Sequence, residues 1–161
     1  MLAMLRFVSL MLGALNLGLA FAHVVEMAPK RAMSGPDWLT TQQAYRDFGR
    51  VAAVTFPTLL LAELATLGLV RERRPIALLT GLAAGATATT VAIWARFNQP
   101  VNREIGTWRA DALPPNWAKR RDQWEYAHAA SAACHAVSLA ALTAAALWDE
   151  RPAASDTRWS V

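Results

Sequence analysis

Hydrophobic positions along the chain gather into four long blocks that contain almost no charged residues. The blocks comprise residues 7–25, 51–70, 76–95 and 127–148. Each is close to the roughly 20 residues that cross the hydrocarbon core of a bilayer as an α-helix. Polar and apolar residues do not alternate inside the blocks, so the pattern does not suit the strands of a membrane barrel. We therefore expect an all-α integral membrane protein, a four-helix bundle.

The expected helices span about residues 3–27, 48–70, 76–97 and 123–148, within a single domain that covers residues 1–161. Four crossings place both ends of the chain on one side of the membrane. Residues 71–75 are too few for anything except a tight turn. The connection before the fourth helix is long and rich in proline and tryptophan, so we expect a structured loop there. The polar tail, residues 149–161, is expected to be mobile.

The first connection contains turn-forming residues followed by a helical pattern. Pro29, Gly35 and Pro36 punctuate it, and a turn is expected from Ser34 to Asp37. From Thr40 onward the sequence favours an amphipathic helix that leads into the second membrane helix.

Composition and charge agree with a membrane protein and exclude nucleic-acid binding. Hydrophobic residues make up 55% of the chain and charged residues 17%, which is too apolar for an ordinary soluble domain. The net charge is +4, but the basic residues stand at the ends of the apolar blocks and form no stripe on a polar face. The lipid bilayer is therefore the first expected partner. Whether the chain forms a homo-oligomer stays open.

The first apolar block also fits a signal peptide, since Arg6 precedes it and Ala20 and Ala22 resemble a cleavage site. We expect a retained helix, because the apolar run continues to Val25 and carries His23. The orientation is ambiguous: ten Lys or Arg residues lie on the side of the first and third connections, and six on the side of the termini. The density of arginine in the short turn at residues 71–74 favours cytoplasmic termini, in a bacterial inner membrane.

Ionisable side chains within the helices fall into two layers. Such groups are costly in a membrane and need a partner or a function. With a rise of about 1.5 Å per residue, one group lies within a turn or two of the surface that carries the first and third connections. This outer layer consists of His23, Glu26, Glu125 and His128. A buried layer lies about 15 Å deeper and contains Asn16, Glu63 and His135.

Three interpretations of the outer layer compete. The two histidines and two glutamates, at i, i+3 spacing on facing helices, form a ligand set for iron, copper or zinc. Alternatively, His128 or His23 removes a proton from an acidic substrate while Arg121 holds the resulting oxyanion. In the third interpretation the charges only pair at helix ends.

The buried layer and the tryptophans also leave alternatives open. Glu63 and His135 form a hydrogen-bonded pair that locks the bundle, or they serve a cofactor or a proton relay. The three histidines are potential axial ligands of a haem, which is non-covalent because no C-x-x-C-H motif is present. Trp108, Trp117 and Trp124 belong to a membrane-interface belt, or they line an aromatic substrate pocket with Asn98 and Asn102. The cofactor is thus none, a metal ion such as iron or copper, or haem.

The third connection and the end of the first helix together resemble a known family. The connection runs Phe97-Asn98-Gln99-Pro100-Val101-Asn102-Arg103-Glu104-Ile105, followed by Trp108, Pro115-Asn116-Trp117, Arg121, Trp124 and His128. The first helix ends in residues 18–26 and Met27-Ala28-Pro29-Lys30. These features are similar to those of the anthrone-oxygenase-like membrane proteins over nearly the whole chain. The sequence departs from the family at Ser131, where an arginine is expected.

The resemblance implies four transmembrane helices and an oxygenase function. Characterised fungal members of the family convert hydroxyanthrones to anthraquinones with molecular oxygen. By that resemblance we expect an oxidoreductase for a hydrophobic phenolic or polyketide-like molecule. His128 is the expected base, Glu125 and His23 its partners or metal ligands, and Asn98, Asn102 and Arg121 the groups that bind oxygen atoms. The alternatives are a non-catalytic metal- or haem-binding membrane protein and a structural subunit of a membrane complex.

Overall fold

The computed structural model describes residues 1–149, which are almost entirely helical. The elements are α1 (Leu2–Ala32), α2 (Gly35–Ala44), α3 (Arg46–Val70), α4 (Arg74–Ile93), the π-helical segment η1 (Trp94–Asn98), α5 (Gln99–Ile105) and α6 (Trp117–Asp149). No β-strand occurs within residues 1–149, which confirms the all-α prediction. The expected mobile tail lies outside the described residues from position 150 onward.

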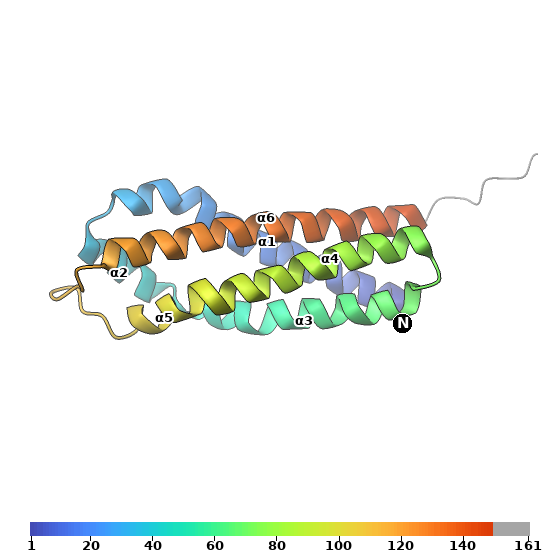
Figure 1. Cartoon of the computed structure of the whole chain (residues 1–161), viewed down its shortest axis with the longest axis horizontal. Helices are drawn as coiled ribbons and strands as arrows, with labels where there is room; N and C mark the ends of the chain where they lie inside the picture. The colour runs from blue at the N-terminus through green and yellow to red at the C-terminus, as the bar shows by residue number, and fades with distance from the viewer. Residues whose placement is uncertain (150–161) are drawn as a thin grey trace, which may run out of the picture.

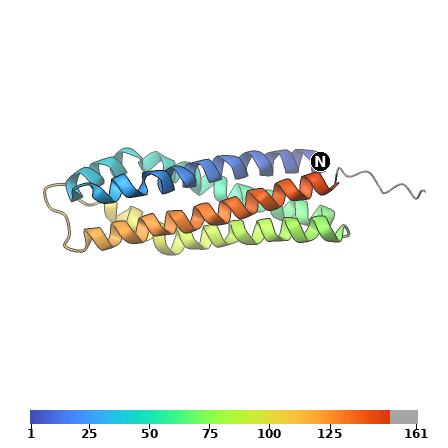
Figure 2. The same cartoon turned by 90° about the horizontal axis from the view of Figure 1, so that it is seen from above.

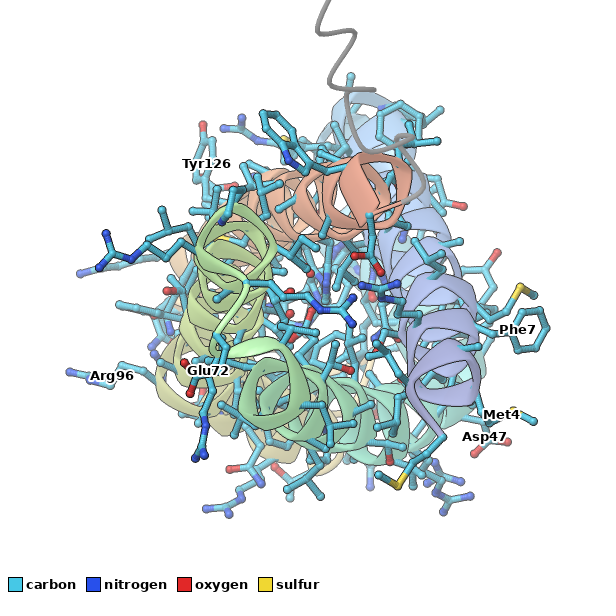
Figure 3. The ribbon with its side chains drawn as sticks, turned by 90° about the vertical axis from the view of Figure 1, so that its right-hand side faces the viewer. Met4, Phe7, Asp47, Glu72, Arg96 and Tyr126 are labelled. Atoms are coloured by element: carbon cyan, nitrogen blue, oxygen red, sulfur yellow. The ribbon has the colours of Figure 1, made fainter. Side chains whose placement is uncertain are left out.

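Four helices are long and apolar enough to cross a membrane. They are α1, α3, α6 and the continuous helical stretch Arg74–Ile105, which joins α4, η1 and α5. They run side by side along the long axis of the molecule (Figure 1). Each packs on two neighbours, in the circular order α1, α3, α4, α6. Large apolar side chains such as Met4 and Phe7 point outward from the bundle (Figure 3), as the lipid-facing surface of a membrane protein requires.

The first helix is longer than its sequence predicts. The expected end near residue 27 is wrong, because α1 continues through Pro29 to Ala32. An ion pair between Lys30 Nζ and Glu26 Oε2, 2.6 Å apart, spans the turn that contains this proline. Lys30 and Arg31 also place positive charge at the C-terminal end of the helix dipole.

The expected turn between the first two membrane helices is the beginning of another helix. The Ser34 hydroxyl oxygen accepts a hydrogen bond from the Asp37 backbone N–H at 3.3 Å and so caps α2. Pro36 stands in the first turn of this helix, where its missing N–H costs nothing. The chain therefore crosses the end of the bundle as α2 rather than as a loop.

A π-helical segment separates α4 from α5 where the third membrane helix meets the end of the bundle. Pro100 follows this segment directly. A proline inside an α-helix clashes with the carbonyl group four residues before it, here that of Arg96. The wider π turn accommodates this clash, and segments of this kind are frequent at functional sites. The third helix therefore does not end at residue 97 but continues to Ile105.

The expected long loop is reduced to residues 106–116, because α6 begins at Trp117 rather than near residue 123. Inside this loop the Arg109 guanidinium donates hydrogen bonds to Asp111 and holds the pKa of that carboxyl group below its usual range. The loop, α2 and α5 lie at the end opposite the N-terminus (Figure 2). Five buried apolar side chains hold this end together: Trp38, Leu39, Val101, Ile105 and Trp124.

Candidate functional site

A cavity of about 730 Å³ opens between the helices at the end of the bundle that carries α2 and α5. Its walls come from α1, the end of α2, the first half of α3, the η1 and α5 segments, and α6. Apolar side chains such as Leu19 and Phe56 share the lining with many polar and charged groups. Cavities of this size and character bind small hydrophobic molecules.

Two histidines from different helices meet in the wall of this cavity. The imidazole rings of His23 on α1 and His128 on α6 have centroids 4.2 Å apart. The Trp124 ring packs edge-on against both, at 4.9 Å from His23 and 4.1 Å from His128. This contact places the predicted base and its predicted partner at one point of the wall.

Asparagine side chains surround Trp124 and take part in its hydrogen bonds. The Trp124 indole Nε1–H donates to Asn102 Oδ1 at 2.7 Å, and Asn98 Nδ2 donates to the Trp124 carbonyl oxygen at 3.2 Å. Asn98 is 1% exposed, and its Oδ1 has no hydrogen-bond partner within residues 1–149. Because Asn102 Oδ1 already accepts a hydrogen bond from Trp124, the NH₂ group of Asn102 is the part of this side chain that can donate a hydrogen bond to a ligand. Both asparagines and Trp124 line the cavity, as expected.

Glu125 is fully buried next to the cavity wall but does not line the cavity. Its closest electrostatic neighbours are Lys30, Arg121 and Glu26, and the indole N–H of Trp38 faces it. Neither carboxylate oxygen makes a hydrogen bond of standard geometry with another described residue. Lys30, one of these neighbours, is itself only 2% exposed and forms its ion pair with Glu26.

Other residues predicted to bind substrate are used elsewhere. The Arg121 guanidinium donates to the Arg31 carbonyl oxygen at 3.0 Å and to Asp122 Oδ1 at 3.1 Å. It stacks on Trp117 and does not line the cavity, so the structure does not place it where an oxyanion would form. Trp108 and Trp117 pack against Trp38 under the loop, also outside the cavity lining.

The four side chains expected to bind a metal are not assembled into a ligand set. Within residues 1–149, no three His, Cys, Asp or Glu side chains are grouped so that they could hold a metal ion. Glu26 is engaged by Lys30, and Glu125 lies outside the cavity that His23 and His128 line. The i, i+3 spacing aligned these residues on their helices but did not bring their oxygen and nitrogen atoms together.

A haem shared by His23 and His128 does not fit their geometry. Each axial nitrogen must stand about 2 Å from the iron on opposite sides, which puts the two ring centroids about 6 Å apart. The observed centroid separation is 4.2 Å. The two rings therefore leave no room for a porphyrin plane between them.

The buried layer lies one to three turns below the cavity. Asn16, Glu63 and His135 are each 0% exposed, as predicted. Glu63 and His135 do not form the expected hydrogen-bonded pair: Glu63 Oε1 accepts from Ser138 at 2.8 Å and from Thr87 at 3.1 Å. Both ring nitrogens of His135 and both amide atoms of Asn16 are buried without a hydrogen bond to the described residues.

Several cavity-lining residues are not among the predicted site residues. Arg46 and Arg50 come from the first turns of α3, Arg103 from α5, and Gln42 from the end of α2. Ser131 also lines the cavity. The arginines on α3 are four residues apart and therefore share a face of that helix. This spacing is the one feature of the sequence that points to these two arginines as site residues. It does not distinguish them from ordinary charged residues that flank membrane helices.

Comparison of the chain with protein-family models, with curated proteins and with solved structures finds no match.

Proposed function

We propose that this protein is a membrane-embedded oxygenase that oxidises a flat hydrophobic phenolic or polyketide-like molecule with dioxygen, as its resemblance to the anthrone-oxygenase-like proteins implies. The observation that supports it best is the contact between His23 and His128 in the wall of a 730 Å³ cavity. A three-ring aromatic molecule suits a cavity of this volume. The long apolar helices allow such a molecule to enter from the bilayer.

The reaction begins with removal of a proton from an activated CH₂ group of the substrate. His128 takes this proton, and the electron pair of the C–H bond is delocalised onto the conjugated carbonyl oxygen as an enolate. The NH₂ group of Asn102 donates a hydrogen bond to that oxygen. The hydrogen bond from Trp124 Nε1–H to Asn102 Oδ1 holds the asparagine side chain in place. The unpartnered Asn98 Oδ1 accepts a hydrogen bond from a phenolic hydroxyl group of the substrate.

The electron-rich carbon then reacts with dioxygen. Overall, the CH₂ group and O₂ become a carbonyl group and one water molecule, so the carbon loses four electrons and dioxygen gains them. One oxygen atom stays in the product and the other leaves in water. The second proton of the CH₂ group and the proton held by His128 both end in that water.

Replacing His128 tests this function. The variants His128→Ala and His128→Gln, purified in detergent, should lose substrate-dependent oxygen uptake with an anthrone as the probe. Cys134→Ala is the matched control on the same helix, since Cys134 does not line the cavity, and it should keep full uptake. Uptake that is unchanged in a folded His128 variant, judged by gel filtration, overturns the assignment.

We also propose that the protein lies in the bacterial inner membrane with cytoplasmic termini. The support is the arginine cluster at residues 71–74, in the short turn that shares a side with both ends of the chain. A reporter enzyme fused after Val161 should be active only in its cytoplasmic form. Activity of a periplasmic reporter at the same position contradicts this orientation.

A further inference from the structure

Glu63 is a carboxyl group buried in the middle of the bundle without an opposite charge. It lies in the second half of α3 and is 0% exposed. No ion pair reaches it from any residue within positions 1–149. Its two oxygens differ in their surroundings: Oε1 accepts hydrogen bonds from the hydroxyl groups of Ser138 and Thr87, and Oε2 is buried without a hydrogen-bond partner.

This arrangement suits a carboxyl group that binds a proton. A lone carboxylate in the interior of a membrane is costly unless a cation or a proton neutralises it. The hydroxyl donors occupy one oxygen and leave the other free to carry hydrogen. Oxygen atoms alone would also suit a sodium ion, so the two occupants have to be distinguished by experiment.

A line of polar side chains on α6 leads from the cavity to Glu63. His128, Ser131, His135 and Ser138 are separated by three, four and three residues, which places them on one face of the helix. The first two line the cavity, and the last donates to Glu63. We call these four residues the α6 polar line.

His135 is the central member of the α6 polar line. It is 0% exposed, and both ring nitrogens are buried without a hydrogen-bond partner in the described chain. Its ring packs against Phe56 with centroids 4.8 Å apart, and Phe56 itself lines the cavity. A neutral imidazole accepts a proton on one nitrogen and donates from the other, so this position suits transfer in either direction.

The opposite side of Glu63 offers a poorer route. The hydroxyl groups of Thr66 and Thr80 donate to the backbone carbonyls of Ala62 and Ile76, both at 2.8 Å, and are therefore not free to carry a proton. Further toward that end, Val70, Ile76 and Ala145 form a buried apolar cluster.

Few ionisable groups surround Glu63. On α1 there is none between Arg6 and His23, and on α4 and η1 none between Arg74 and Arg96. On α6, between His128 and Asp149, only Cys134 and His135 are ionisable, and Cys134 is partly exposed. Within the described bundle, His135 is therefore the one nearby buried group that can compete with Glu63 for a proton.

We propose that Glu63 is a membrane-embedded proton-exchange site that equilibrates with the cavity through the α6 polar line. His135 is the positioning residue between Glu63 and the cavity. The proposal does not rest on the oxidation proposed above, because proton exchange at Glu63 is measured without any substrate.

Dicyclohexylcarbodiimide is a suitable probe, because it reacts with protonated carboxyl groups in apolar surroundings. The carboxyl O–H adds across one C=N bond of the carbodiimide, and the product rearranges to a stable N-acylurea with no leaving group. The full-length protein, reconstituted in phosphatidylcholine vesicles, should acquire this label at Glu63, located by mass spectrometry of its peptides. Labelling should decrease as the pH is raised.

Variants distinguish a proton site from a sodium site and from a carboxyl group that only joins helices. Glu63→Gln should lose the label while keeping the hydroxyl hydrogen bonds, and Glu63→Asp should keep it. His135→Ala should slow the decline in reactivity of Glu63 toward carbodiimide added at successive times after a jump to alkaline pH. Ser9→Ala, a buried hydroxyl on α1 toward the opposite end, is the matched control and should behave like the unmodified protein. Absence of label on Glu63 in the folded protein, protection by sodium ions at constant pH, or an effect of Ser9→Ala equal to that of His135→Ala overturns the proposal.

Discussion

The contact between His23 and His128 restricts the charge that this part of the wall can carry. Their rings are 4.2 Å apart, so two imidazolium cations there would repel each other in surroundings with little water. At least one ring is therefore neutral and able to accept a proton. Trp124 packs against both rings and fixes their positions. An imidazole held in place by an aromatic neighbour is what the proposed removal of a proton from a carbon acid requires.

Trp124→Phe tests the link between this aromatic neighbour and binding of the enolate. The ring contacts with the histidines stay, but the 2.7 Å hydrogen bond to Asn102 is lost. Such a bond contributes about 0.5–1.5 kcal/mol and holds the amide group that binds the enolate, so kcat with an anthrone should fall about 2- to 12-fold with a smaller change in KM. Steady-state oxygen uptake measures both constants. Trp124→Ala, which also removes the ring, should lower kcat much further, and equal kinetics of the two variants would contradict this division of roles.

Sequence reasoning at the residue scale succeeded where spacing along one helix was enough. The matching separations of polar residues on α1 and α6 predict that His23 and His128 lie close together, and their rings are in contact. They also predict that Asn16 and His135 are buried, and both are 0% exposed. It failed for Arg121, because a long flexible side chain has several partners within reach. Its guanidinium donates a hydrogen bond to the Arg31 carbonyl oxygen at the end of α1, and no pattern in the sequence reports that tertiary contact.

At the scale of elements, the cavity depends on the small helices that cover the end of the bundle. Gln43 on α2 donates hydrogen bonds to the backbone carbonyls of Ile105 and Trp108, at 3.1 and 3.2 Å. Trp38, which is 0% exposed, packs between Trp108 and Trp117. These contacts join α2 to α5 and to the loop.

Gly35→Ala tests how tightly α2 is seated. A methyl group at this position would lie 2.5 Å from Leu113 Cδ1 and 3.0 Å from the Trp117 ring. The leucine tip can turn away, but the partly buried Trp117 ring, packed against Trp38, has less freedom, so we expect a loss of about 1–3 kcal/mol in the stability of this region. Gly18→Ala on α1 is the control, because nothing lies within 4 Å of its added methyl group. Thermal unfolding in detergent should show a lower midpoint for Gly35→Ala and an unchanged or higher one for Gly18→Ala.

The ends of the helices were harder to predict than their existence. Apolar blocks of about 20 residues located all four membrane helices, because the bilayer sets their length. Prolines misled the assignment of the ends, since Pro29 and Pro100 were read as loop residues and stand inside continuous helical stretches. The π-helical turn before Pro100 and the ion pair beside Pro29 depend on geometry that residue types alone do not reveal.

At the scale of the whole molecule, the two ends of the bundle are built differently. The end with α2 and α5 is the broader one (Figure 1). Its buried core is rich in tryptophan, and it holds the cavity. The opposite end is closed by a small charged network in which Asp149 pairs with Arg6 and with Arg73, both at 2.7 Å. This network ties the end of α6 to α1 and to the turn before α4. Ion pairs therefore join the helices at one end of the bundle, and the cavity lies at the other end.

Asp149→Asn measures how much that charged network stabilises the bundle. Single exposed ion pairs contribute about 0–1 kcal/mol, but Asp149 serves two arginines and only 21% of its side chain is exposed. We expect Asp149→Asn to lower the free energy of unfolding by about 1 kcal/mol more than Asp47→Asn, which removes the exposed pair with Arg50. Thermal unfolding of both variants in detergent provides the comparison, and added salt should narrow the difference. Substrate KM should stay unchanged in Asp149→Asn, because the network and the cavity lie at opposite ends. Equal midpoints of thermal unfolding for the two variants would mean that the network does not hold the helices together.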